Sequence, residues 1–138
     1  VILDLGKQQA WDFVSSAVRN LQDYTNEINS ITQLEEYYDG YLCSVAYSDG
    51  LVVQERVFFI KDAARVLIRL DDHPLYKGEM VLQVISVDDE FLIDRKSTLV
   101  CVLSWRIHPG LIEAPMLDKQ EYVEQLLQNI QQKTKLSY

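Results

Sequence analysis

Hydrophobic residues recur at helical spacing through the first quarter of the chain. From Lys7 to about Glu36 the sequence contains no proline or glycine, and apolar residues return every three or four positions. This pattern predicts a long amphipathic N-terminal helix, or two helices with a break near Asn29. The apolar run before it predicts a short edge strand within residues 1–6. The positions of the helical stripe are Trp11, Val14, Val18, Leu21, Ile28 and Ile31.

The middle of the chain changes to a period of two, which is the side-chain period of a β-strand. The turn signals Tyr38-Asp39-Gly40 and Ser48-Asp49-Gly50 flank the first alternating run, and the second contains the Asp-Gly pair typical of a hairpin loop. We therefore predict an antiparallel meander of about five strands. A short helix is the alternative for 65–70, where the β-branched content favours a strand. The strands are expected at about 41–48, 51–60, 65–70, 79–87 and 98–108.

The chain closes with a second helical pattern. Asp118 and Glu121 stand three residues apart, as in a capping box, and an apolar face follows as far as about Lys133. Residues 134–138 show no periodicity, so we predict a dispensable, frayed tail. The residues of the apolar face are Tyr122, Val123, Leu126, Leu127 and Ile130.

The order of these elements predicts the fold class. A helix, consecutive antiparallel strands and a closing helix indicate an α+β fold in which both helices pack on one face of the sheet. No Gly, Ser or Pro cluster is long enough to be a linker, so residues 1–138 are expected to form a single domain.

Composition narrows the classes of partner. The chain carries 21 acidic and 13 basic side chains, a net charge of −8, which disfavours a surface that collects phosphates. No run approaches the roughly 20 apolar residues that a bilayer span requires. We expect no nucleic-acid partner and no membrane partner. Two cysteines are too few for a disulfide scaffold, and on this ground a cytoplasmic location is expected.

Few residues suggest chemistry. His73 and His108 each precede a proline and have no partner at metal-ligand spacing, so the segment Asp71-Asp72-His73 is expected to be a solvated loop. Cys43 and Cys101 alternate with large apolar neighbours, as small core residues do, although their pairing is left open. Glycine loops for phosphates and compact hydrolase motifs are absent from the sequence. We predict no metal and no cofactor, and a non-enzymatic function is favoured over an enzymatic one.

Strand parity points to a candidate binding surface. If Cys43, Val57, Ile68, Val84 and Cys101 face the helices, that face is almost wholly apolar, and four arginines gather among apolar residues on the other face. Arginine beside apolar side chains is typical of protein interfaces, although the protein's own carboxylates could also pair with it. The predicted binding residues are Arg56, Arg65, Leu67, Arg69 and Arg106.

These observations lead to a functional hypothesis with alternatives. The preferred function is a non-enzymatic interaction module, an adaptor or chaperone-like domain that binds an acidic segment of another polypeptide. A homodimer through the N-terminal helix is an alternative use of that helix. The rival function is a small-molecule-binding or enzymatic α+β cone, which requires polar groups converging between sheet and helices. A third possibility is mimicry of nucleic acid by the acidic first half.

Overall fold

One large antiparallel sheet and two helices make up the protein. The computed structural model describes residues 1–110 and 119–137 of the chain. The α+β class with a large antiparallel sheet and two helices is confirmed, but the main sheet has seven strands rather than about five. The helices are α1 (Lys7–Val18) and α2 (Lys119–Ser137), with short 3-10 turns η1 (Leu21–Asp23) and η2 (Lys61–Ala63). The strands are β1 (Ile2–Leu3), β2 (Ile28–Tyr37), β3 (Gly40–Tyr47), β4 (Val52–Ile60), β5 (Arg65–Leu70), β6 (Tyr76–Lys77), β7 (Glu79–Ser86), β8 (Ser97–Leu103) and β9 (Arg106–Ile107).

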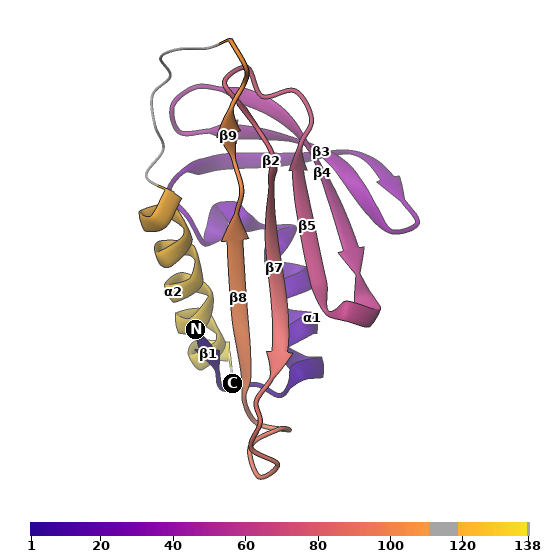
Figure 1. Ribbon diagram of the computed structural model, residues 1–138, viewed down its shortest axis with the longest axis vertical. Coiled ribbons are helices and arrows are strands. Elements are labelled where there is room, and N and C mark those ends of the chain that lie inside the picture. The colour runs from indigo at the N-terminus through magenta and orange to yellow at the C-terminus, as the bar shows by residue number, and fades with distance from the viewer. Residues whose placement is uncertain (111–118, 138) are drawn as a thin grey trace.

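The sheet is a meander closed by the N-terminal strand. Its order is β1-β8-β7-β5-β4-β3-β2, and β6 pairs with β9 in a separate two-stranded extension. Figure 1 shows α2 running alongside β8, with β1 between them at one edge of the sheet. The edge strand predicted within residues 1–6 is present as β1, which pairs with Thr98 and Ser97 of β8. The strand prediction for 65–70 is also correct, because β5 occupies these residues.

The long N-terminal helix was a wrong prediction. Helix α1 ends at Val18, and the second half of the predicted helix is strand β2, which pairs with β3. A bulge between Ile28 and Ser30 shifts the register, so Ile28 and Ile31 both contact the core although they are three residues apart. This bulge imitates helical spacing in a strand that is otherwise mostly exposed.

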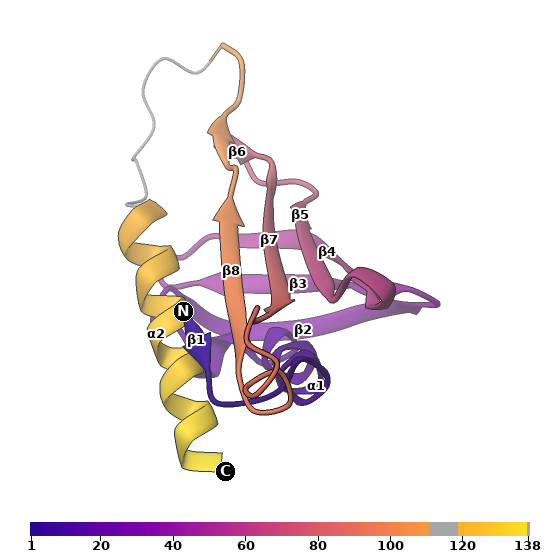
Figure 2. The same ribbon diagram turned by 60° about the horizontal axis from the view of Figure 1, so that its bottom comes forward.

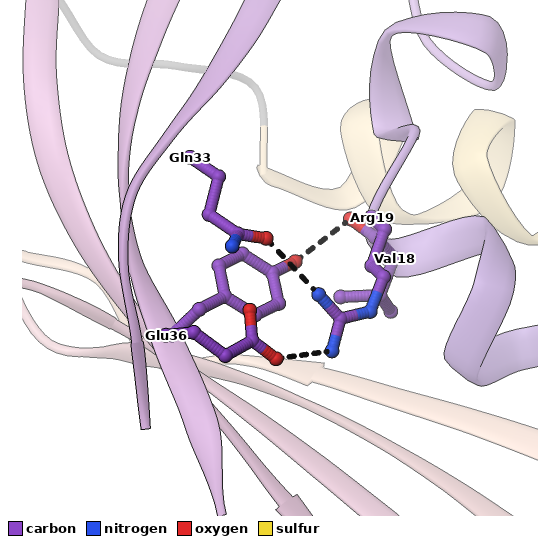
Figure 3. Close-up of polar contacts among 5 residues, drawn as sticks. Val18, Arg19, Gln33 and Glu36 are labelled. Carbon is purple, nitrogen blue, oxygen red and sulfur yellow. Dashed lines mark hydrogen bonds and ion pairs between the residues drawn. The ribbon is translucent and has the colours of Figure 1, made fainter. Parts of the chain in front are cut away.

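Arg19, immediately after α1, joins this helix to the edge strand. Its guanidinium lies 3.2 Å from Oε1 of Gln33 and 3.3 Å from Oε1 of Glu36, both on β2. The same group lies 4.6 Å from the ring centroid of Tyr41, whose hydroxyl donates to the Val18 carbonyl oxygen at 3.5 Å (Figure 3). This cluster fixes the point at which the chain leaves the helix and enters the sheet.

A single large core joins both helices to alternate residues of the sheet. The apolar stripe of α1 is buried in this core. Leu126 and Ile130 of α2 are 0% exposed within the same cluster. The two helices lie on different parts of the sheet, as Figure 2 shows. Other members of the cluster include Trp11, Val14, Val18, Val45, Val57, Val66, Ile68, Leu82, Val84 and Leu99.

Helix α2 is longer than predicted. It extends through Ser137, whereas the sequence pattern placed its end near Lys133. Thr134 is buried, and its hydroxyl donates to the carbonyl oxygen of Gln131 at 2.6 Å, so a frayed tail does not begin at residue 134. The predicted cap residue Asp118 lies outside the described residues.

Candidate functional site

The predicted binding residues of β4 and β5 lie on the outer face of the sheet, away from the helices. Arg56 stands opposite Arg69 in the β4–β5 register, and Arg65 stands opposite Ile60. Leu67 lies between the two arginines of β5 and is half-buried. Arg106 is on β9, beyond the end of the main sheet. The structure therefore brings four of the five predicted residues onto two adjacent strands, whereas Arg106 comes from the separate β6–β9 pair.

The outer arginines have few charged partners. In the described ranges, Arg56 forms the one ion pair of the four, at 3.4 Å from Oδ1 of Asp71. Arg69 lies with its guanidinium 5.3 Å from the ring centroid of Phe58, and Arg65 contacts Oε1 of Gln83 at 3.4 Å. The Nε atom of Arg65 is buried and has no hydrogen-bond partner among the described residues. Within these ranges, Arg65 and Arg69 are not neutralised by the protein's surplus of carboxylates.

A surface pocket connects Arg69 with Arg106. Its volume is about 420 Å³, and its wall comes from the end of β5, the β6–β7 junction and the β8–β9 junction. A side chain at Gly78 would meet the Ser104 carbonyl oxygen at 2.3 Å, which explains why glycine occupies this close approach. The lining residues are Arg69, Leu70, Lys77, Gly78, Glu79, Ser104 and Arg106.

The inner face contains a carboxyl group that the sequence analysis missed. Glu55 is on β4, is 5% exposed and points to the same side as Val53 and Val57. The Tyr47 hydroxyl donates a hydrogen bond to its Oε2 atom. Burial raises the pKa of Glu55 to about 7, although the Tyr47 hydrogen bond acts in the opposite direction. The expectation of an almost wholly apolar inner face was wrong at this position.

Five rings extend from Glu55 toward the β6–β9 end of the sheet. Tyr47 lies edge-on to Trp105, with ring centroids 6.3 Å apart, and Tyr76 stacks on Trp105 at 5.9 Å. His73 lies 6.0 Å from Trp105, and Tyr122 of α2 lies 6.4 Å from it on another side. Trp105 is therefore the centre of this group. We call Glu55 and these five rings, Tyr47, His73, Tyr76, Trp105 and Tyr122, the inner cluster.

His73 is a buried member of the cluster and not the solvated loop residue that was predicted. It is 6% exposed, and its Nδ1 atom accepts the backbone N–H groups of Leu75 and Tyr76, each at 3.1 Å. Burial lowers the pKa of its imidazole. The His108 Nε2 atom lies 2.7 Å from the carbonyl oxygen of His73. The imidazole packs against Tyr76, three residues further along the chain, and against Trp105, which is 32 residues away and gave no signal near the histidine.

Two polar groups of the cluster have hydrogen-bonding capacity that the described residues leave unused. The Nε1 atom of Trp105 is buried and has no hydrogen-bond partner within the described residues, and an unmade bond of this kind costs about 1–3 kcal/mol. A carboxyl with a pKa near 7 can donate a hydrogen bond in its protonated form and accept one in its ionised form. The cluster therefore combines aromatic faces, one donor and one group that switches between donor and acceptor.

The thiols and the acidic turn lie where the sequence placed them. Cys43 is buried, Cys101 packs against the same core, and both are free. The segment Asp88-Asp89-Glu90 is exposed between β7 and β8. In the part of the chain that the structure describes, no three His, Cys, Asp or Glu side chains are grouped to hold a metal ion. The described helices also include none that is long and apolar enough to cross a bilayer.

A signal for Glu55 was present in the sequence. Glu55 is two residues from Val53 and two from Val57 within the predicted strand 51–60. The alternation of a strand therefore places its side chain on the same, inward side of the sheet as theirs. The aromatic contacts had no such signal, because Trp105 lies after the end of β8 and reaches Tyr47 only through the sheet's three-dimensional curvature. The sequence could indicate the acid but not its surroundings.

Comparisons with known proteins identify the fold alone. No protein-family model and no curated protein matches the chain. The solved structure of TTHA0849 from Thermus thermophilus is similar, with a TM-score of 0.69 and 10% identity over 99% of this chain and 94% of that one. An uncharacterised protein from Bacillus thuringiensis has a TM-score of 0.62 and 17% identity, covering 98% of this chain and 95% of that one. At these identities the likeness extends to the architecture over nearly the full length of each chain.

Proposed function

We propose that the protein binds a small, largely apolar molecule at the inner cluster, with Glu55 as the group that recognises its polar end. The observation behind this proposal is a carboxyl that is 5% exposed and is met by one tyrosine hydroxyl in the described residues. Burying such a group is expensive unless it is well hydrogen-bonded. Acids in this state are more common at ligand and active sites than in structural cores.

The surrounding rings indicate the kind of molecule. Binding sites for small molecules are mostly apolar and aromatic, with a small number of polar groups that set orientation. The inner cluster has this composition, since Tyr76, Trp105 and Tyr122 provide ring faces and edges around the buried Glu55. The Nε1–H of Trp105, unpaired within the described residues, fits an acceptor atom on the ligand. A flat, neutral molecule with one hydrogen-bonding edge matches these groups.

A neutral fluorescent probe can test this function. N-phenyl-1-naphthylamine is apolar and carries one N–H donor, so we expect it to bind saturably and to fluoresce more strongly in the bound state. Glu55→Leu keeps the volume but removes the acceptor, and should weaken binding by about fivefold to tenfold, the effect of one lost hydrogen bond. Glu79→Leu, on the outer surface, is the matched control. Failure of the wild type to bind, or equal binding by a folded Glu55→Leu variant, would contradict the proposal.

The second candidate is docking of an acidic polypeptide segment on the outer face, centred on Arg65 and Arg69. The observation that favours it is the position of these arginines, without an ion pair in the described ranges, beside apolar side chains in a protein of net charge −8. A synthetic acidic peptide should bind the wild type and lose binding to an Arg65→Glu, Arg69→Glu variant whose circular dichroism is unchanged. A Lys133→Glu, Lys135→Glu variant on α2 controls for the same change in net charge. Equal capture by the folded double variant would exclude this face.

A further inference from the structure

The two ends of the β7–β8 hairpin carry opposite charge. At one end, the surface pocket collects Arg69, Lys77 and Arg106 against the single carboxylate of Glu79. At the other end, Asp88, Asp89 and Glu90 follow one another at the tip of the connection between the strands. Figure 1 shows this tip at the bottom of the molecule, opposite the β9 end. We call these two features the basic pocket and the acidic tip.

The basic pocket is electrostatically incomplete. Lys77 and Arg106 are direct cross-strand partners in the β6–β9 pair, and like charges in this position repel. Neither of them forms an ion pair in residues 1–110 and 119–137, and the same holds for Arg69. The backbone under the pocket is fixed, because Ser104 N donates to the Glu79 carbonyl oxygen at 2.8 Å. A carboxylate placed here would relieve the repulsion without any rearrangement.

The acidic tip is ordered and carries an exposed aromatic ring. Phe91 is 82% exposed directly after the three acids, and its N–H donates to Oδ1 of Asp89 at 2.9 Å. Covering this ring with a partner would remove its apolar area from water and would favour association. The tip thus presents carboxylates and one large apolar side chain to the same outside space.

An apolar strip joins the two charged ends. On the outer face of the hairpin, Val81 is the cross-strand partner of Val102, and Gln83 is the partner of Val100. Val102 is 53% exposed and Ile85 is 45% exposed. These side chains form an apolar strip on the outer face, and the same strip of a second copy can pack against it.

We infer that the outer face of the β7–β8 hairpin binds a second copy of this chain, antiparallel, with the acidic tip of each copy on the basic pocket of the other. A two-fold axis perpendicular to the strands puts both apolar strips in contact and satisfies both charged contacts at once. Strand β7, roughly 27 Å long, separates the tip from the pocket in each copy, and the two-fold axis makes the two contacts identical. The inference rests on the second candidate function, because it keeps Arg69 as a contact and names the acidic partner, but Lys77 and Arg106 take the place of Arg65.

The symmetry of the contact separates this arrangement from other modes of association. A single tip-to-pocket contact without the two-fold axis would leave a free tip and a free pocket, and would build open chains. The two-fold arrangement closes, so the only association product is a dimer. Because its ends are charge pairs at the surface, the dimer should weaken as salt screens them.

Charge exchange tests the inference in the full chain. Analytical ultracentrifugation over a dilution series should show a monomer–dimer equilibrium for the wild type that shifts toward monomer at about 0.5 M salt. Two double variants are compared: one carries Lys77→Glu and Arg106→Glu, and the other carries Asp88→Lys and Asp89→Lys. Each should weaken the dimer by about tenfold or more, because each variant places like charges opposite each other at both contacts. An equimolar mixture of the two variants should recover the dimer, since each pocket then meets a tip of opposite charge. A Lys133→Glu, Lys135→Glu variant on α2 is the control for net charge.

Three results would overturn the inference: a wild type that stays monomeric at every concentration, open-ended oligomers, or a mixture of the folded variants that remains monomeric. Circular dichroism verifies that each variant is folded, and the salt dependence of the wild type needs no variant. A synthetic peptide of residues 86–96 separates binding of an acidic segment at the outer face from formation of the dimer. Binding of this peptide by a monomeric wild type would retain the outer-face function while rejecting the dimer.

Discussion

Glu55 couples the stability of the protein to pH. The pKa of its carboxyl is about 7 in the folded protein and about 4.5 in the unfolded chain, so the folded state binds the proton more tightly. The unfolding free energy is therefore expected to fall as pH rises from about 4.5 to 7. Each pKa unit corresponds to about 1.4 kcal/mol, which makes the full loss about 3 kcal/mol.

We expect Glu55→Gln to remove this dependence. The amide has the size of the carboxyl but carries no charge, so the variant should gain stability relative to the wild type as pH rises, by about 3 kcal/mol at pH 8 compared with pH 4.5. Urea unfolding at both values measures the difference. The exposed Glu124→Gln on α2 is the control. An equal pH dependence of wild type and Glu55→Gln would show that Glu55 is solvated in solution.

His73 should act in the opposite direction. Its Nδ1 atom must be unprotonated to accept two backbone N–H groups, and its pKa is lowered by burial. The unfolded chain therefore binds the proton more readily, and stability is lost as pH falls below about 6.5. His73→Asn keeps an acceptor near the same place without titrating. Its unfolding free energy should change less than that of the wild type between pH 7 and 5, and an identical slope would contradict this assignment.

At the scale of elements, α2 is integral to the fold. Leu126 is 0% exposed and lies in the same cluster as Val14 of α1 and Leu99 of β8. Replacing a buried leucine with alanine costs about 2–5 kcal/mol. Leu126→Ala should lower the melting temperature clearly, whereas the exposed Gln128→Ala should leave it nearly unchanged. An unchanged melt for Leu126→Ala would mean that α2 is detachable.

Only glycine fits at position 40, where the turn after β2 leads into β3. A Cβ atom added at Gly40 would lie 1.7 Å from the Val57 carbonyl oxygen, which belongs to the backbone of β4. Gly40→Ala must therefore push two paired strands apart and is expected to cost more than about 2 kcal/mol. Chemical denaturation measures this loss, with Ala46→Gly in the same strand as a comparison for the intrinsic effect of glycine.

At the scale of the whole molecule, the sequence predicted the elements that have a local hydrophobic pattern. It did not predict the contacts between residues that are far apart in the chain. Strands β3, β4 and β5 followed from their period of two and from two Asp-Gly turns. Strand β2 was misread because its bulge placed two isoleucines at helical spacing. The outer arginines followed from parity alone, and the opposite parity of β4 contained Glu55. The inner cluster depends on contacts between Tyr47, His73 and Trp105, which no local pattern encodes.

The position of β1 has a consequence for the order of folding. Its partners on β8, Ser97 and Thr98, come late in the sequence, and Gln131 of α2 donates to the Ile2 carbonyl oxygen at 2.8 Å. The strands from β2 to β8 pair by closing short loops. Strand β1 can pair only when the last long strand and the final helix are present, because its partners lie far along the sequence. The start of the chain should thus be the last part to become native. The Leu99 amide donates to the Val1 carbonyl oxygen, and the Phe59 amide donates to the Asp39 carbonyl oxygen. In pulsed hydrogen exchange during refolding, we expect the Leu99 amide to become protected later than the Phe59 amide.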